Sequence, residues 1–140
     1  MKNLKNSLLL LLAAVIVSAL AVVPAHAQSG RISANVPFDF VVDKTTLKAG
    51  TYAVKTDGDF LAIVSESGKT VYTLPLTGDS RDVHGGEPYL VFARYGNESF
   101  LTRVVFSESN TRRLAPNSRE KEMMARTSGD TVNVHSGAGQ

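Results

Sequence analysis

Apolar and polar residues alternate in six short stretches along the middle of the chain. The stretches lie at about 36–42, 51–56, 60–65, 70–75, 89–95 and 100–107, and each is rich in Val, Tyr, Phe, Thr or Ile. Successive side chains of a β-strand point to opposite faces, so in "VPFDFVV" the apolar Val36, Phe38, Phe40 and Val42 share a face that excludes Asp39. The pattern predicts six β-strands.

The links between these stretches are short and contain glycine. Asp57-Gly58, Ser67-Gly68 and Gly96-Asn97 each separate two consecutive stretches. Tight hairpin turns favour such pairs because their central residues adopt positive φ. Parallel strands would need a crossover of about a dozen or more residues. The sequence therefore predicts an all-β fold: a single antiparallel β-sandwich or partly open barrel of six to seven strands.

The chain changes character after the sixth stretch. Asn117 is followed three residues later by Glu120, which is the spacing of a helix N-terminal cap. Glu122 and Arg126 are spaced for a favourable pair on one helix face. These features predict a short C-terminal helix at 117–126. The expected organisation is a polar lead at 28–35, a β domain at 36–116, the helix, and a flexible tail at 127–140 in which 131–134 is a candidate seventh strand.

The first 27 residues have the three parts of a secretory signal. Lys2 and Lys5 precede an uncharged apolar run from 8 to 23, and Ala25 and Ala27 supply the small residues of a cleavage site. The run is shorter than the roughly 18–20 residues that cross a bilayer. We expect cleavage between Ala27 and Gln28, a secreted or periplasmic location, and no transmembrane segment after cleavage.

Removal of this signal changes the charge balance. The signal carries two lysines and no acidic residue, so the 15 basic residues fall to 13 and equal the 13 acidic ones. A neutral chain lacks the basic footprint of nucleic-acid binders, so we expect no nucleic-acid partner. The chain has no cysteine, which excludes thiol chemistry and leaves stability to packing and strand pairing.

The six Phe and four Tyr all lie within or at the start of the predicted strands. Aromatic rows stack on sugars in some proteins, but aromatic residues also concentrate in the cores of β domains, which is the interpretation we favour. Tyr89 and Tyr95 are the aromatic residues expected to point outward and to contribute to a binding face.

The connection 77–88, "TGDSRDVHGGEP", is the longest within the predicted β domain, and loops of this length are often functional. Its acids offer oxygen ligands for calcium, yet their spacing also fits ordinary turn chemistry. After signal removal two histidines remain, too few for a zinc site. Ser80, Asp82 and His84 lack a nucleophile elbow. We therefore expect no catalytic residue, metal or cofactor, and the candidate binding residues are Asp79, Asp82, His84, Glu87, Tyr89 and Tyr95.

Four stretches carry a family resemblance: "VPFDFVV", "LKAGTYAV", "YLVFARYGNESFLTRVVF" and "SREKEMMAR". Together they resemble small exported bacterial β-rich proteins of unknown function, which share a Phe-x-Phe strand, a Leu-x-Ala-Gly-x-Tyr turn and a Tyr-Gly hairpin. The resemblance covers most of residues 33 to 126. It implies an exported β domain and supplies no catalytic residues.

These observations favour an exported, non-enzymatic binding or scaffolding protein of the cell envelope or extracellular space. Its expected partner is another envelope protein or polymer, and its expected contact surfaces are the 77–88 loop and any exposed edge strand. One alternative is a β-barrel that binds a small apolar ligand between its strands. A less favoured alternative is a hydrolase that uses loop carboxylates.

Overall fold

The computed structural model describes residues 30–76 and 86–137. Within them the chain forms ten strands and one helix. In chain order these are β1 (Arg31–Val36), β2 (Phe40–Val42), β3 (Thr45–Leu47), β4 (Gly50–Asp57), β5 (Phe60–Ser65), β6 (Thr70–Thr73), β7 (Tyr89–Tyr95), β8 (Glu98–Ser107), β9 (Asn110–Arg113), α2 (Ser118–Arg126) and β10 (Asp130–His135).

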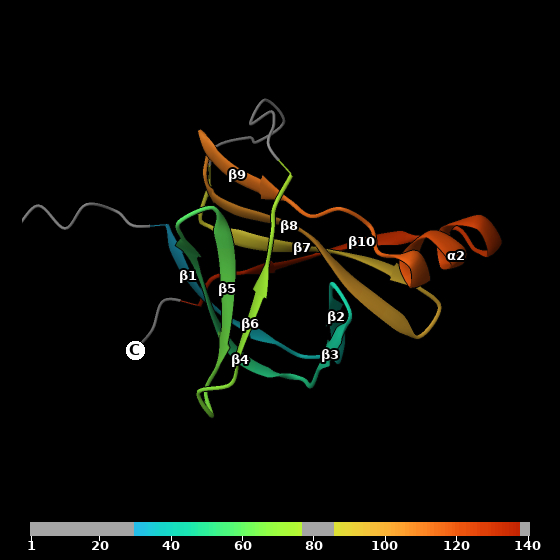
Figure 1. The fold of residues 1–140 in the computed structure, drawn as a ribbon, viewed down its shortest axis with the longest axis horizontal. Helices are drawn as coiled ribbons and strands as arrows, with labels where there is room; N and C mark the ends of the chain where they lie inside the picture. Colours follow the sequence, from blue (N-terminus) through green and yellow to red (C-terminus); the bar gives the residue numbers. More distant parts are fainter. Residues whose placement is uncertain (1–29, 77–85, 138–140) are drawn as a thin grey trace, which may run out of the picture.

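The strands form two sheets that pack face to face (Figure 1). One sheet has the order β1-β4-β5-β6, and the other has the order β10-β7-β8-β2-β3, with β9 also paired to β8. All pairings are antiparallel except that of β2 with β8, which consists of Val41 beside Phe100. The sheets stay separate, so the all-β prediction is confirmed as a sandwich with a C-terminal helix. The described residues form ten strands, more than the six to seven expected.

The three predicted glycine hairpins are confirmed. They join β4 to β5, β5 to β6 and β7 to β8, all antiparallel. Gly58, Gly68 and Gly96 have φ values of 59°, 86° and 60°, a left-handed conformation that costs glycine little because it has no Cβ. Local turn chemistry therefore sets the register of these pairs.

The predicted strand 36–42 is wrong as a single element. Pro37 has no backbone N–H and lies between β1, which ends at Val36, and β2, which begins at Phe40. The expected polar lead is part of the β domain, because β1 begins at Arg31 and directs Ile32, Ala34 and Val36 into the core. Its polar residues occupy the exposed face of the same strand.

The expected tail also contains a strand. β10 pairs with β7 over Asp130–His135, so the candidate seventh strand at 131–134 exists and is longer than expected. The short strands β3 and β9 were not predicted. The domain therefore extends on both sides of the predicted range 36–116.

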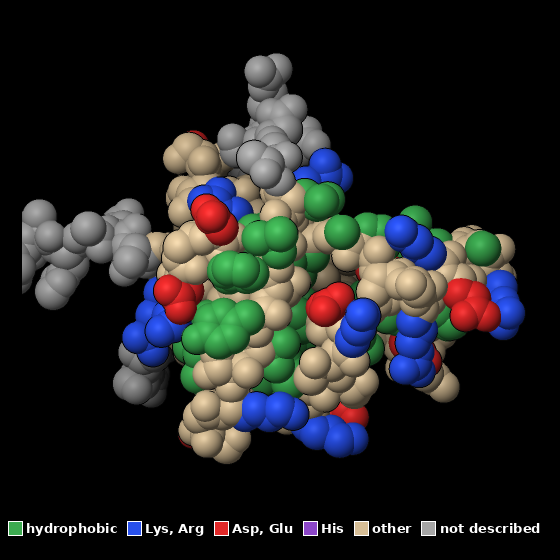
Figure 2. All heavy atoms as spheres, in the orientation of Figure 1, with side chains coloured by type: hydrophobic (Ala, Val, Ile, Leu, Met, Phe, Trp, Pro, Cys, Tyr) green, Lys and Arg blue, Asp and Glu red, His purple; other side chains and the backbone are tan. Residues whose placement is uncertain are grey.

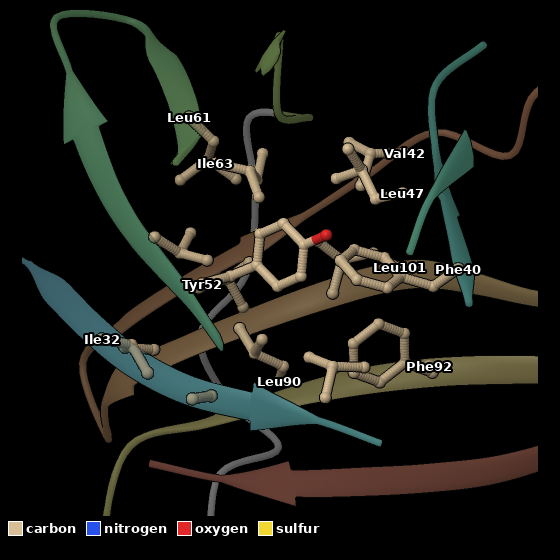
Figure 3. Packing of buried hydrophobic residues seen from close by; sticks show 14 of the residues in the cluster. Ile32, Phe40, Val42, Leu47, Tyr52, Leu61, Ile63, Leu90, Phe92 and Leu101 are labelled. Carbon is tan, nitrogen blue, oxygen red and sulfur yellow. The ribbon is translucent and has the colours of Figure 1, made fainter. Parts of the chain in front are cut away.

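The core lies between the two sheets, and aromatic rings form its centre (Figure 3). Phe92 contacts Phe38 and Phe40 edge to face, with ring centroids 5.2 and 5.3 Å apart. Phe40 makes the same type of contact with Tyr52 at 5.0 Å. Branched aliphatic side chains from both sheets surround these rings, including Ile32, Val54, Leu61, Ile63, Leu90 and Val104. The interior is therefore filled by side chains.

Two of the motifs behind the family resemblance contact each other. The Asp39 carboxylate accepts hydrogen bonds from Lys48 Nζ at 2.8 Å and from the Ala49 N–H at 2.9 Å. The Tyr52 hydroxyl donates to the Lys48 carbonyl at 2.6 Å. The bond from Lys48, followed by that from Ala49, holds the pKa of Asp39 below its usual value. The Phe38–Phe40 segment and the Ala49-Gly50 turn thus form one structural unit.

The predicted helix is confirmed, as is its cap. The Asn117 side chain accepts a hydrogen bond from the Glu120 N–H at 2.7 Å, and Arg126 pairs with Glu122 at 2.7 Å. Asn117 also donates to the Asp43 carbonyl, which ties the start of α2 to the turn between β2 and β3. Across residues 30–76 and 86–137, no helix has the length and apolarity needed to cross a membrane.

Candidate functional site

The candidate residues inferred from the sequence do not form one site within the described residues. Asp79, Asp82 and His84 lie outside those residues. Glu87 is exposed, and the half-buried Tyr89 has its ring centroid 5.3 Å from that of His135. The expectation that Tyr95 points outward is wrong, because its side chain is 8% exposed. Tyr95 packs with Val41, Phe100 and Met123, so helix α2 covers the face on which it lies.

Other apolar residues are exposed instead, on the opposite sheet. Phe60, Tyr72, Leu74 and Leu76 are 49%, 56%, 61% and 51% exposed, and we call these four residues the β6 patch. Figure 2 shows hydrophobic side chains gathered over β5 and β6 on this face. Surface apolar residues that lie together in this way commonly mark interaction sites.

Strand alternation explains why the β6 patch is exposed. Leu61 and Ile63 of β5 belong to the core, and their cross-strand partners in β6 are Thr73 and Val71. Tyr72 therefore lies on the other face of the sheet, because successive side chains alternate. The sequence contained a sign of this exposure, since "TVYTLPL" carries apolar residues at both odd- and even-numbered positions and therefore on both faces of a strand. The alternation does not say which face has a covering layer.

The backbone of β6 also has unpaired groups. The Ser65 N–H donates to the Lys69 carbonyl at 2.8 Å, which makes these two residues a hydrogen-bonded pair of the ladder. Such pairs alternate in antiparallel sheets, so Val71 and Thr73 bond to β5 while Thr70 and Tyr72 point their N–H and C=O groups away from it.

After β6 the chain continues along the same edge, and its outward-facing backbone there pairs with β9. The Leu76 N–H donates to the Arg113 carbonyl at 2.7 Å. β6 itself is the last strand of its sheet, so the outward groups of Thr70 and Tyr72 have no backbone partner among the described residues. Within residues 30–76 and 86–137, this edge is therefore open to an added strand.

A groove of about 220 Å³ runs beside this edge, between β6 and the start of α2. We call it the β6 groove. Apolar side chains from both sheets form most of its wall: Val41, Phe60, Tyr72, Leu74, Phe100, Leu101 and Leu114. Its charged residues are Asp43 and Glu120, and no Lys or Arg lines it. The groove thus combines apolar side chains with a polar, acidic surface.

A second hollow of about 520 Å³ shares Phe60 and Leu74 with the β6 groove. It continues along Pro75 and Leu76 toward Arg112, with Asp59 on the same wall. The two hollows therefore follow the chain from β6 toward its bridge with β9.

Glu120 is unusual for a charged residue on a short helix, because it is 5% exposed. Burial raises the pKa of its carboxyl group, and a hydrogen bond from the Asn117 backbone N–H acts in the opposite direction. Within the described residues no Lys, Arg or His forms an ion pair with it. The nearby Glu120 charge also contributes, after burial, to a raised pKa of Tyr95.

We expect the free energy of unfolding of Glu120→Gln to increase relative to that of the unchanged chain as pH rises. An acid with a raised folded-state pKa contributes stability that is present below its unfolded pKa and is lost as pH rises through the folded pKa. Glutamine keeps the cap geometry and removes the charge. Urea unfolding at pH 4 and pH 8 measures the effect, and a difference between variant and parent that is the same at both values contradicts it.

The described residues do not bring together three or more His, Asp or Glu side chains as a set of metal ligands. Comparisons of the chain with protein-family models, with curated proteins and with solved structures found no match.

Proposed function

We propose that this chain is an exported, non-enzymatic binding or scaffolding protein of the cell envelope or extracellular space, and that it binds an extended segment of another polypeptide along β6. The observation that carries the proposal is the unpaired outward edge of β6 beside the β6 patch. Main-chain hydrogen bonds to an exposed edge supply affinity for an added strand, and adjacent pockets supply specificity.

The composition of β6 supports this function. Exposed edges are usually protected by short length, charged side chains, proline, bulges or a covering element. β6 is short, with four residues, but Thr70–Thr73 contains no charge and no proline, since Lys69 and Pro75 lie just outside it. An edge without charge or proline can pair with another chain, so a partner that covers it gives this surface a use.

The filled interior favours a polypeptide partner over a small apolar ligand. A barrel-type binder holds its ligand in a cavity between strands. Here the side chains between the sheets pack against one another, and the β6 groove lies at the molecular surface beside an open strand edge. A segment that pairs with the backbone and places side chains in the groove uses both features.

Export is supported by the signal-like segment 1–27, which lies outside the described residues, and by the resemblance to small exported bacterial proteins. The partner is then another protein of the same compartment.

Tyr72→Pro tests the role of the edge directly. Proline removes the outward N–H of Tyr72 and leaves the bonds of Val71 and Thr73 to β5, which is where edge strands tolerate proline. The matched control Tyr72→Thr removes the ring and keeps the N–H. We expect the dissociation constant of a partner captured from the exporting cell envelope to be about tenfold higher for the proline variant than for the threonine variant.

Circular dichroism checks that both variants fold. Equal affinity of the two folded variants contradicts the proposal, because the backbone of β6 then plays no part in binding.

A further inference from the structure

We propose that the segment bound along β6 carries a lysine or arginine, and that the cation of this side chain enters the β6 groove and pairs with the carboxylates of Glu120 and Asp43. This inference rests on the proposed function and specifies the chemistry of its partner.

The charges on the groove wall carry the inference. Both ionised side chains that line the β6 groove are acidic. Of the basic residues nearest in the chain, Lys121 does not line the groove, and Lys44 and Arg119 line a neighbouring hollow that also contains Asp43. Arg119 pairs with Glu98. An incoming cation therefore meets two carboxylates and no basic side chain on the groove wall, whereas an incoming acid meets repulsion.

One side chain links the backbone segments that carry the two acids. Asn117 accepts from the Glu120 N–H and donates to the Asp43 carbonyl. Asp43 itself has a φ of 52°, a left-handed conformation that fixes the turn between β2 and β3. The backbone that carries both acids is thus ordered before any partner binds, which reduces the ordering cost of binding.

The burial of Glu120 makes a cationic partner favourable. A buried carboxylate without an opposite charge is costly, and a hydrogen-bonded cation offsets part of that cost. The Asn117 backbone N–H is one partner for this carboxylate, but it carries no formal charge. A cap by itself does not require burial, because the glutamate of a capping box works equally well at the surface.

The apolar wall suits the rest of a long basic side chain. Lysine and arginine stems lie along apolar surfaces while their heads reach polar groups. Phe60, Tyr72 and Phe100 line the same groove as Glu120, and aromatic faces attract cations. A shorter polar side chain lacks both interactions.

A random dodecapeptide display library, selected on the purified exported chain, tests the inference. We expect the enriched peptides to carry Lys or Arg at one fixed position, flanked by β-branched or aromatic residues. A synthetic peptide from this selection should bind Glu120→Gln and Asp43→Asn about tenfold or more weakly, since hydrogen bonds to charged groups contribute about 1.5–3 kcal/mol. Replacing its basic residue by norleucine should cause a similar loss.

Glu122→Gln is the matched control. It removes the same charge from the same helix, but Glu122 is exposed and pairs with Arg126 outside the groove. We expect unchanged peptide affinity for this variant. A retained helix signal in circular dichroism shows that the loss of affinity in Glu120→Gln is not caused by unfolding of α2.

The outcomes separate this inference from the proposed function. Two results overturn the inference and leave the proposed function standing. In the first, peptide binding needs the Tyr72 N–H but shows no preference for a basic residue. In the second, the peptides bind Glu120→Gln and Glu122→Gln equally. No enrichment, or equal binding to Tyr72→Pro and Tyr72→Thr, overturns both. Dimerisation through β6 that excludes peptide also overturns the inference, since a second copy is then the occupant.

Discussion

Phe92→Ala is expected to lower the free energy of unfolding by about 3–5 kcal/mol, the usual cost of removing a buried phenylalanine. Phe92 is fully buried and makes edge-to-face contacts with Phe38 and Phe40, so its loss leaves a void between the sheets. Domains of this size have total stabilities of about 5–15 kcal/mol, so the variant loses a large part of its stability. Urea unfolding followed by circular dichroism measures the change.

Phe60→Ala is the matched control for Phe92→Ala. The same side chain is removed, but Phe60 is half exposed at the start of β5 and belongs to the β6 patch. We expect a loss of less than about 1 kcal/mol, because solvent already surrounds much of the ring. Equal losses in the two variants contradict the assignment of Phe92 to the core and Phe60 to the surface.

Gly129→Ala is expected to cost about 1–3 kcal/mol through overpacking. Gly129 lies between α2 and β10, against the ring of Tyr95. A Cβ at this position would overlap the ring, with Cδ1 and Cζ each 2.9 Å away. Tyr95 is itself buried against Phe100, so the ring has little room to move. Thermal or urea unfolding gives the magnitude.

Gly137→Ala provides the comparison, because a Cβ there meets nothing within 4 Å. Its expected effect on the free energy of unfolding is within about 0.5 kcal/mol. A Gly129→Ala variant as stable as Gly137→Ala would show that the connection between α2 and β10 does not pack on Tyr95.

The elements predicted correctly from the sequence are those encoded by neighbouring residues. The hairpins at Gly58, Gly68 and Gly96 follow from turn chemistry, and the helix start follows from Asn117 and Glu120. The missed strands depend on distant partners. β1 becomes a strand by pairing with β4, and β10 by pairing with β7. β1 alternates like the predicted strands, but its apolar residues are aliphatic without an aromatic, and β10 has only Val132 and Val134 as apolar residues, so both segments read as polar when the partner is unknown.

The surface was harder to predict than the strands. Alternation shows that Val71 and Tyr72 face opposite ways, but which face is covered depends on the packing of the sheets. For this reason Tyr95 was expected outside and is buried, while Tyr72 was expected in the core and is exposed. Glu120 was recognised as a cap residue, yet its burial depends on where α2 lies on the second sheet.

Amide hydrogen exchange at β6, followed by NMR at low protein concentration, tests the central claim most directly. The claim is that the outward edge of β6 is unpaired in the isolated chain and binds a partner strand. The Tyr72 and Thr70 amides should then exchange rapidly, while those of Val71 and Thr73, which bond to β5, should exchange slowly. Protection of Tyr72 equal to that of Val71 in the isolated chain would show that the edge is already covered and would contradict the account.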